Sequence, residues 1–351
     1  MAYTTINKST DYFNTVLYTG NGTAIGSGGK TVTGVGFQPD FVWGKARSGT
    51  DAVDNHELTD AVRGVTKYLK CNNNSAETTS AESLTSFTND GFILGNNGQM
   101  NRNGNNCVAW NWKANGQGSS NTAGSINTTY TSVNTTAGFS ISKYTGTTSA
   151  GATVGHGLGV APSMIITKNL GRSGGAGNWV VYHKSLGNTK YLLLNESNAE
   201  GSSSGAWNNT TPTSSVFTVG DFDSTNGSEG MIAYCFAEKT GYSKFGSYTG
   251  NGNADGTFIY TGFKPAFYII KRTSDTFSWI IKDNKRPGYN VNGSYLVANT
   301  NGAEATGSGN VAIDEYSNGF KIRGTSDALN GSGQPYIYMA FGQSLVGSNN
   351  V

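Results

Sequence analysis

The sequence predicts an all-β protein built from three tandem antiparallel β-sandwich domains of the jelly-roll kind. Three observations support this: a motif that occurs three times, a composition that favours strands, and turn signals between short apolar runs. Charged residues make up 13% of the chain, and 50 of its 351 residues are glycine, against about 25% and about 7% in average proteins. Because β-branched and aromatic residues are plentiful while long charged residues are scarce, strands are favoured over helices.

The repeated motif begins with Tyr-Thr-Gly and passes through a proline turn into an apolar strand. Proline belongs at the turn before a strand because it cannot donate to the strand ladder. The strand that follows, at residues 267–270 in the third copy, is apolar on both faces, which predicts a central strand covered on both sides. A repetition of this length predicts an internal triplication. The copies begin at Tyr18, Tyr144 and Tyr248, and their prolines are Pro39, Pro162 and Pro265.

Further segments follow each copy in the same order and predict the remaining strands. A strand opened by tryptophan comes first, with His56 in place of the tryptophan in the first copy. A Tyr-Leu strand running into Ala-Glu comes next, and then Asn-Gly or Asp-Gly turns that favour tight hairpins. An aromatic strand closes each copy, and short strands separated by turns predict a sandwich or jelly roll. The closing strands are residues 108–112, 232–236 and 337–341.

The spacing of the copies predicts the domain boundaries. We expect a first domain at residues 1–114, a linker at 115–137, a second domain at 138–238 and a third at 239–351. Each repeat has about 100 residues, a common size for a domain with its own core. The linker is rich in Gly, Ser, Thr and Asn and should be flexible or loosely paired. Residues 1–14 form either a first strand, which we favour, or an arm that docks on a partner.

Charge and cysteine usage exclude several function classes. A net charge of +2 gives no electrostatic footprint for nucleic acid. The N-terminus lacks the basic and apolar regions of a signal peptide, and no apolar run approaches the roughly 20 residues of a membrane span. The three cysteines have no metal-ligand spacing and are expected to be small buried side chains. We therefore expect no metal and no cofactor.

The recurring acids do not form the pair that a glycoside hydrolase needs. Such enzymes place two carboxyl groups roughly 5–10 Å apart around one bond. Glu77, Glu200 and Glu304 recur once per repeat without a second acid in register, so we expect loop carboxylates that bond to backbone N–H groups. Asp60 and Asp283 align with each other, but His183 takes their place in the second repeat.

The remaining catalytic and ion-binding patterns are weak. No Gly-x-Ser-x-Gly elbow accompanies the three histidines; His56 occupies a packing position and His156 lies in a turn. The Gly-Asn-Gly turns lack the lysine and Ser/Thr of a phosphate loop. Residues 221–227 carry oxygen ligands suited to Ca²⁺ but no bidentate glutamate at loop spacing. The sequence thus predicts no enzyme.

Aromatic residues are the more informative set for ligand binding. Most of the tryptophans recur at aligned strand positions, which favours core packing. Trp207 is unmatched in the other repeats and lies in a loop rich in Gly, Ser and Asn. Because binding residues are often carried on loops, Trp207, Asn208 and Asn209 are the predicted ligand-binding residues.

Six segments carry a resemblance to a known family: residues 1–13, 36–43, 60–64, 108–114, 241–252 and 336–341. They include Gly-Phe-Gln-Pro-Asp-Phe-Val-Trp and Tyr-Ile-Tyr-Met-Ala-Phe. Over essentially its whole length the chain resembles a family of bacteriophage proteins abundant in marine phage genomes. The resemblance implies a virion structural protein, tail-fibre-like or host-recognition-like, with lectin-like β domains, and it carries over no catalytic residues.

The expected function is therefore a tail-fibre or receptor-binding component that contacts host surface glycan. Its partners would be other virion proteins and further copies of itself, with a trimer favoured because phage fibres are commonly trimers. Weak sites multiplied by copy number would give avidity. We expect it in the virion after synthesis in the host cytoplasm, without membrane insertion. The alternative is a capsid decoration or head-fibre protein, and a third class is a polysaccharide hydrolase.

Overall fold

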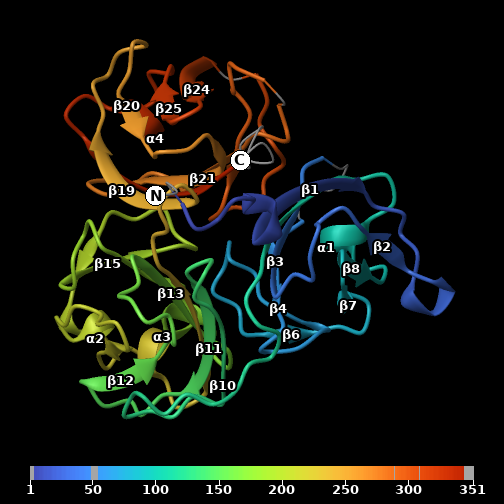
Figure 1. Cartoon of the computed structure of the whole chain (residues 1–351), viewed down its shortest axis with the longest axis vertical. Coiled ribbons are helices and arrows are strands. Elements are labelled where there is room, and N and C mark those ends of the chain that lie inside the picture. Colours follow the sequence, from blue (N-terminus) through green and yellow to red (C-terminus); the bar gives the residue numbers. More distant parts are fainter. Residues whose placement is uncertain (1–3, 49–53, 288, 308, 344–351) are drawn as a thin grey trace.

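The structure is a computed structural model that describes residues 4–48, 54–287, 289–307 and 309–343. It is an all-β protein whose strands pair antiparallel, with a few short helical turns, and Figure 1 shows three groups of strands arranged around a common centre. We call these groups the first, second and third units. Among the described residues, no helix has the length and apolar character needed to cross a membrane.

The first unit has a main sheet of order β1-β9-β3-β4 and a small sheet of order β2-β8-β7. In chain order its elements are η1 (Ser9–Asp11), β1 (Phe13–Thr19), η2 (Ile25–Ser27), β2 (Lys30–Val32), β3 (Phe41–Ala46), β4 (Glu57–Asp60), β5 (Lys67–Tyr68), β6 (Thr78–Thr79), β7 (Leu84–Thr88), β8 (Gly91–Leu94), α1 (Gly98–Asn101) and β9 (Asn106–Trp112).

The second unit has a main sheet of order β10-β11-β18-β13-β14-β15-β16 and a small sheet β12-β17. Its elements are β10 (Tyr130–Asn134), β11 (Phe139–Thr145), β12 (Ala152–Gly155), β13 (Met164–Asn169), η3 (Gly174–Gly177), β14 (Val180–His183), β15 (Lys190–Leu193), β16 (Gly201–Ser202), α2 (Ser204–Trp207), β17 (Val216–Val219), α3 (Asp223–Asn226) and β18 (Gly230–Phe236).

The third unit has a main sheet of order β19-β26-β21-β22-β23 and a small sheet β20-β25-β24. Its elements are β19 (Ser243–Thr249), β20 (Phe258–Tyr260), β21 (Pro265–Arg272), β22 (Ile280–Asp283), β23 (Leu296–Val297), η4 (Gly309–Val311), β24 (Ile313–Tyr316), β25 (Gly319–Ile322), α4 (Asp327–Asn330) and β26 (Pro335–Gly342).

The main sheets share one strand order: β1-β9-β3-β4, β11-β18-β13-β14 and β19-β26-β21-β22. A buried asparagine just before each closing strand is also shared. Its side-chain nitrogen donates at 2.7–3.0 Å to the carbonyl six residues earlier. Its oxygen accepts at 2.8–2.9 Å from a backbone N–H in the turn after Tyr-Thr-Gly. The three residues are Asn101, Asn226 and Asn330.

Each main sheet separates two apolar cores. One face packs on the small sheet of the same unit, forming what we call a private core. The other face joins a shared core that contains side chains from all three units. Alternate residues of the central strand therefore serve different cores: Phe41 and Trp43 the shared one, Val42 the private one. The prediction of central strands covered on both faces is confirmed, since β3 and β13 are buried throughout.

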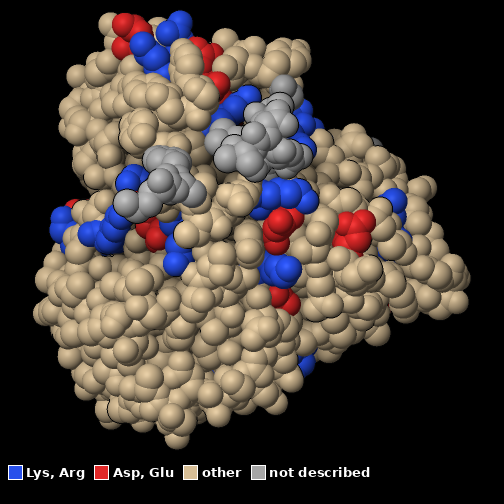
Figure 2. Space-filling view, viewed as in Figure 1, with Lys and Arg blue, Asp and Glu red and all other residues tan. Residues whose placement is uncertain are grey.

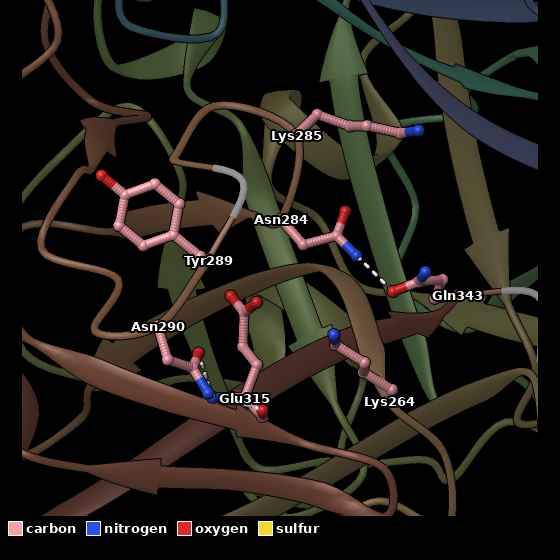
Figure 3. A pocket seen from close by; sticks show the side chains of 7 residues that line it. All are labelled: Lys264, Asn284, Lys285, Tyr289, Asn290, Glu315 and Gln343. Atoms are coloured by element: carbon pink, nitrogen blue, oxygen red, sulfur yellow. Dashed lines mark hydrogen bonds between the residues drawn. The ribbon is translucent and has the colours of Figure 1, made fainter.

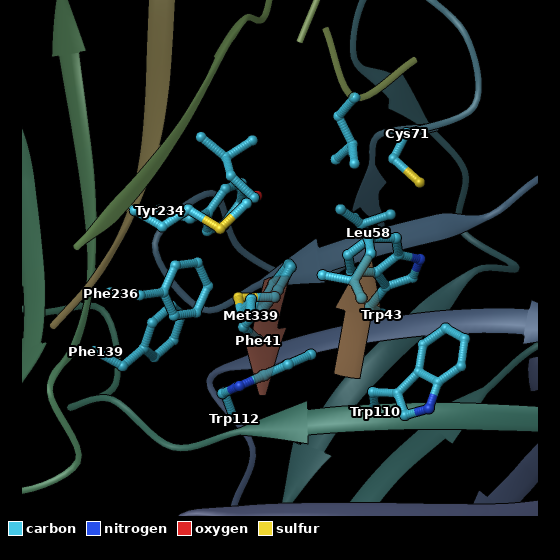
Figure 4. Packing of buried hydrophobic residues seen from close by; sticks show 14 of the residues in the cluster. Phe41, Trp43, Leu58, Cys71, Trp110, Trp112, Phe139, Tyr234, Phe236 and Met339 are labelled. Atoms are coloured by element: carbon cyan, nitrogen blue, oxygen red, sulfur yellow. The ribbon is translucent and has the colours of Figure 1, made fainter. Parts of the chain in front are cut away.

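Three aromatic side chains from the closing strands meet in the shared core. Trp112, Phe236 and Phe341 are each at most 2% exposed. Their ring centroids are 6.4 Å (Trp112–Phe236), 5.7 Å (Trp112–Phe341) and 6.1 Å (Phe236–Phe341) apart, within the range of favourable aromatic contacts. Figure 4 shows Phe41, Phe139 and Met339 beside Trp112 and Phe236. The predicted core role of these strand aromatics is confirmed.

Equivalent backbone hydrogen bonds join the units into a closed ring. In each case the N–H of the glutamate that follows Ala donates at 2.8 Å to a carbonyl two residues after the aligned strand lysine of the next unit. The first unit donates to the second, the second to the third and the third to the first. The donor–acceptor pairs are Glu77–Leu170, Glu200–Thr273 and Glu304–Arg47.

A second hydrogen bond crosses each junction, from a ring at one aligned position to a carbonyl of the preceding unit. It runs opposite to the glutamate N–H bonds, which donate to the following unit. The indole of Trp179 donates to the carbonyl of Lys70 at 3.0 Å, and that of Trp279 donates to the carbonyl of Leu193 at 2.8 Å. His56 replaces the tryptophan in the first unit, and its Nε2 contacts the carbonyl of Val297 at 3.0 Å. Burial lowers the pKa of His56 to about 3, so the imidazole is neutral. His56 thus keeps the hydrogen bond of the residue it replaces.

His183, which replaces the aspartate in the second unit, is also explained by the hydrogen bond that its position makes across a junction. Asp60 accepts from the Tyr234 hydroxyl at 2.8 Å, and Asp283 accepts from the Trp110 indole at 3.0 Å, each across a junction. At the third junction Met339 stands in the place of Trp110 and Tyr234 and has no side-chain donor. The second unit presents His183 there, whose Nε2 contacts the neighbouring Tyr338 carbonyl at 3.2 Å.

Arginine follows the acid in the same pattern. Arg63 pairs with buried Asp60, and Arg286 with buried Asp283, at 2.5 and 2.6 Å. In the second unit, which has no such acid, Leu186 occupies the arginine position and packs against the shared core. An unpaired buried charge is costly, so acid and arginine occur together or not at all.

The predicted linker is paired rather than flexible. Residues 130–134 form β10, which adds an edge strand to the second unit by pairing with β11. The Ile126 N–H donates to the Thr153 carbonyl at 2.9 Å, and the Ile126 side chain joins the private core of the second unit. Hydroxyl groups also bond within the segment, including Thr128 to Thr131 at 2.9 Å. Of the two alternatives for this segment, pairing matches these contacts.

The strand favoured for residues 1–14 is present only at their end, and the residue before it contacts another unit of the same chain. Phe13 begins β1, which pairs with β9 along its whole length. The preceding Tyr12 lies against Tyr242 of the third unit, with ring centroids 6.3 Å apart. Residues 1–3 are outside the described part of the chain.

Three aligned lysines are buried beside the junctions. Lys45, Lys168 and Lys271 are at most 1% exposed, and each ammonium donates to the carbonyl of the next residue, at 2.7, 2.5 and 2.5 Å. Burial is the largest cause that lowers their pKa values, to about 8 for Lys45, about 7 for Lys168 and about 8 for Lys271.

We predict that Lys168→Met removes part of the pH dependence of stability. The pKa of Lys168 is about 7 in the folded chain and about 10.4 when unfolded. Between these values the unfolded chain binds more protons, so stability rises with pH. Urea unfolding at about pH 7 and about pH 9.5 should show a larger gain for the wild-type chain than for the variant. Equal gains would contradict the assignment.

Candidate functional site

The predicted ligand residue Trp207 is buried, which corrects the prediction for its ring. The side chain is 1% exposed and lies in the private core of the second unit, where it meets Tyr182 edge-on with centroids 5.9 Å apart. Its Gly/Ser/Asn-rich surroundings form the short helix α2, capped by Ser203, which accepts from the Gly205 N–H at 3.1 Å. The helix turns the tryptophan inward, so the ring cannot stack on a ligand in this structure.

Asn208 and Asn209 shape the turn after this helix. Both adopt left-handed backbone angles, with φ of 49° and 48°, which asparagine tolerates better than most residues. Asn208 is half-buried and Asn209 is exposed, and the Asn209 carbonyl accepts from the Asn188 side chain at 2.9 Å. The three predicted residues are therefore not assembled into one binding surface.

The other candidate residues from the sequence are buried or paired within the protein. His156 is fully buried in its turn, with its Nε2 3.2 Å from the Thr213 carbonyl, and burial lowers its pKa. Glu77 and Glu304 accept from arginines at the junctions. Within the described ranges, no group of three or more His, Cys, Asp or Glu side chains gathers as a metal site would require.

A polar cavity of about 370 Å³ lies at the side of the third unit (Figure 3). Lys264 and Lys285 line it, together with amides such as Asn284, which donates to Gln343 at 2.7 Å. Glu315 is also in the lining, but its Oε1 accepts from Tyr268 at 3.0 Å and from Asn292 at 2.8 Å. Burial raises the pKa of this carboxyl. The Glu315 carboxyl is thus occupied by hydrogen bonds within the third unit.

Exposed aromatic rings instead mark the outer face of the small sheet β20-β25-β24. Phe258 is 43% exposed, Tyr260 59% and Tyr316 41%. Among the described residues, every exposed aromatic side chain belongs to the third unit; the fourth is Tyr289. Exposed apolar groups gathered on one surface are a mark of binding sites. We call Phe258, Tyr260 and Tyr316 the aromatic face.

Strand alternation positions these rings. On β20, Ile259 points into the private core while Phe258 and Tyr260 point outward. Tyr260 pairs with Gly319, which pairs with Tyr316, so a glycine separates two tyrosines in one row across the sheet. Phe258 leans over Gly319 and meets Tyr316 edge-on with centroids 5.9 Å apart. A side chain at Gly319 would approach the Ile259 carbonyl to 2.1 Å, so this position requires glycine.

The equivalent positions of the other units carry no aromatic residue. Matching the strands by their pairing with the buried phenylalanines Phe92, Phe217 and Phe320 places small residues at the ring positions. In the first unit these are Thr31, Thr33 and Thr88, and in the second Thr153 and Gly155. The scaffold therefore does not need the rings, and their presence in one unit points to a role at the surface.

Charged groups border the aromatic face. Lys321 pairs with Asp255, and Arg323 lies 3.5 Å from Asp314 and 3.8 Å from Asp255. The hydrogen bond from Lys321 lowers the pKa of Asp255, so this acid is ionised at neutral pH. Figure 2 shows charges of both signs at the outer end of the third unit, whereas the lower, outer part of the second unit is almost free of charge on the visible face.

This surface offers flat rings beside groups that donate and accept hydrogen bonds. Aromatic faces carry negative potential and attract weakly positive C–H groups, which one side of a sugar ring presents. Carboxylates and ammonium groups at the edge match its hydroxyls. Sequence reasoning missed the three residues. The sequence pattern that indicates two of them is Phe-Ile-Tyr at 258–260, because the first repeat has Thr-Val-Thr at the equivalent residues 31–33.

Trp207→Ala should destabilise the chain by about 3–5 kcal/mol, because removing a large buried ring leaves a cavity. Chemical denaturation measures this loss. Trp207→Phe is the matched control and should cost much less, since the indole N–H has no hydrogen-bond partner among the described residues. A stability unchanged in the alanine variant would contradict the burial of this ring.

Comparison with known proteins places the chain in a family but not in a functional class. Searches of curated proteins and of solved structures found no match to the chain. A family model described as a domain of unknown function, DUF7483, matches residues 8–344. This span includes all three units with their junctions, so the chain belongs to the DUF7483 family.

Proposed function

We propose that the chain is a phage virion structural protein that contacts host surface glycan through the aromatic face of its third unit. The observation that carries this proposal is the set of exposed rings at positions where the other units have threonine or glycine. A tail-fibre or receptor-binding component fits such a surface. The resemblance to marine phage proteins supplies the virion location, and the protein would reach the particle without crossing a membrane.

The common strand order supports a more specific origin for the fold. We infer that the three units derive from one β-sandwich module, lectin-like or jelly-roll-like, that was copied twice. The aligned asparagines and the equivalent junction bonds are what such an origin would leave. On this account two copies kept a plain outer sheet, and the third acquired binding side chains.

A non-enzymatic role agrees with the use made of the recurring acids. Asp60 and Asp283 form buried pairs with arginine, and Glu304 accepts from Arg47 and Arg286. These carboxylates stabilise junctions instead of flanking an open cleft. A homotrimer remains our prediction for the fibre, although three units of one chain already complete the ring around the shared core.

Replacing the three rings by the threonines of the first unit tests the proposal. The variant Phe258→Thr/Tyr260→Thr/Tyr316→Thr should bind bacterial surface polysaccharides on a glycan array about tenfold or more weakly. Aromatic contacts at the centre of an interface often contribute more than about 1 kcal/mol each. The thermal midpoint should change little, because the same strand positions tolerate threonine elsewhere in the chain.

Leu17→Thr is the matched control, since Leu17 is 41% exposed on the first unit and outside the aromatic face. It should bind as the wild-type chain does. Equal binding by the triple variant would contradict the proposed site. The alternative, a capsid decoration or head-fibre protein, shares the exposed surface but not the attachment point; antibody labelling of particles on the head instead of the tail would favour it.

A further inference from the structure

A second cavity, of about 420 Å³, lies in the second unit beside α3 and β15, far from the aromatic face in Figure 1. Its apolar lining includes Tyr191, Leu193 and Phe222, and its polar lining includes Asp221 and Asp223. The rings of Tyr191 and Phe222 stand edge to face, with centroids 5.6 Å apart and planes 88° apart. They form an aromatic corner with acids at its rim.

Both rings rest on glycine backbone. A Cβ at Gly201 would lie 2.5 Å from Cζ of Tyr191, and a Cβ at Gly205 would lie 2.3 Å from Cε1 of Phe222. Real Cβ atoms do not approach so closely, so any larger residue would push the rings out of place. Each ring is thus packed against backbone on one side, which restricts its positions before a ligand arrives and lowers the entropy lost on binding.

Phe222 stands where helix capping favours a polar residue. In the first and third units, Asn97 and Ser326 cap the equivalent short helices by accepting from a backbone N–H. Phe222 is the N-cap of α3 and makes no such bond. A residue that breaks a local rule at the cost of stability often serves a binding function. Its half-buried ring lines the cavity and also packs against the private core of the second unit.

The acids restrict the chemistry of the ligand. Within the described part of the chain, the carboxylates of Asp221 and Asp223 have neither an ion-pair nor a hydrogen-bond partner, and both residues are exposed at the rim. Two unpaired carboxylates accept hydrogen bonds and repel anions. They do not gather with a third acid, cysteine or histidine as a metal site would require.

We propose that this cavity binds one residue of a neutral pyranose. A sugar ring presents an apolar face for the corner of Tyr191 and Phe222, and hydroxyl donors for Asp221 and Asp223. Pockets that combine apolar walls with a few placed polar groups are the usual form of small-ligand sites. This site is independent of the aromatic face and of the virion assignment, because it depends on different residues in a different unit.

The variant Phe222→Ser tests the proposal because it restores the cap found at Ser326. The probes are methyl glucoside, methyl galactoside and methyl mannoside. Their binding to the full chain is measured by saturation-transfer NMR and titration calorimetry. At least one should bind the wild-type chain, and Phe222→Ser should weaken it about tenfold or more. The thermal midpoint should change little, because the new cap offsets part of the packing that the half-buried ring makes with the private core.

Asp221→Asn provides a second variant on the surface of the fold and should also weaken binding. The triple threonine variant of the aromatic face should bind the methyl glycosides as the wild-type chain does, which separates this site from that face. Glucuronate should bind more weakly than methyl glucoside. Absence of binding by all three methyl glycosides would overturn the proposal. So would tighter binding of choline or Ca²⁺, or undiminished sugar binding by Phe222→Ser.

Discussion

The contact of Trp112, Phe236 and Phe341 constrains the rest of the structure. Each residue lies in the last two positions of the closing strand of its unit, and none can be buried by that unit alone, because the private core lies on the other face of the sheet. Burying a large aromatic side chain is strongly favourable. Three sheets must therefore come together to cover these rings, and the hydrogen bonds at the junctions follow from that approach.

The junctions show how one arrangement accommodates different residues. Where Trp110 or Tyr234 offers a side-chain donor, the facing unit has an aspartate with its arginine. Where Met339 offers none, the facing residue is His183, which uses a backbone carbonyl. His56 likewise preserves a hydrogen bond that tryptophan makes elsewhere. The three junctions keep the same geometry, while the hydrogen-bonding side chains on their two sides change together. A buried polar group left without its partner would be costly.

Patterns repeated along the sequence predicted much of the fold. The succession of strands along each repeat and the covered central strands follow from periodicity and turn residues, whereas the order of the strands within each sheet was not predicted. The closed ring could not be predicted, because it depends on pairs such as Glu304 and Arg47 that are 257 residues apart. The prediction that Trp207 binds a ligand was wrong because the local composition indicated a loop, whereas four residues form a helix that buries the ring. The aromatic face needed an alignment by strand register, which the sequence shows only once Phe92 and Phe320 are matched.

Calorimetric unfolding of the full chain tests the shared core most directly. If the three units depend on one another for burial of their central rings, the chain should unfold in one transition, with calorimetric and van 't Hoff enthalpies in a ratio of about one. Independent domains would instead unfold in separate steps, and the ratio would rise well above one. Two or three resolved transitions in the intact chain would contradict the account.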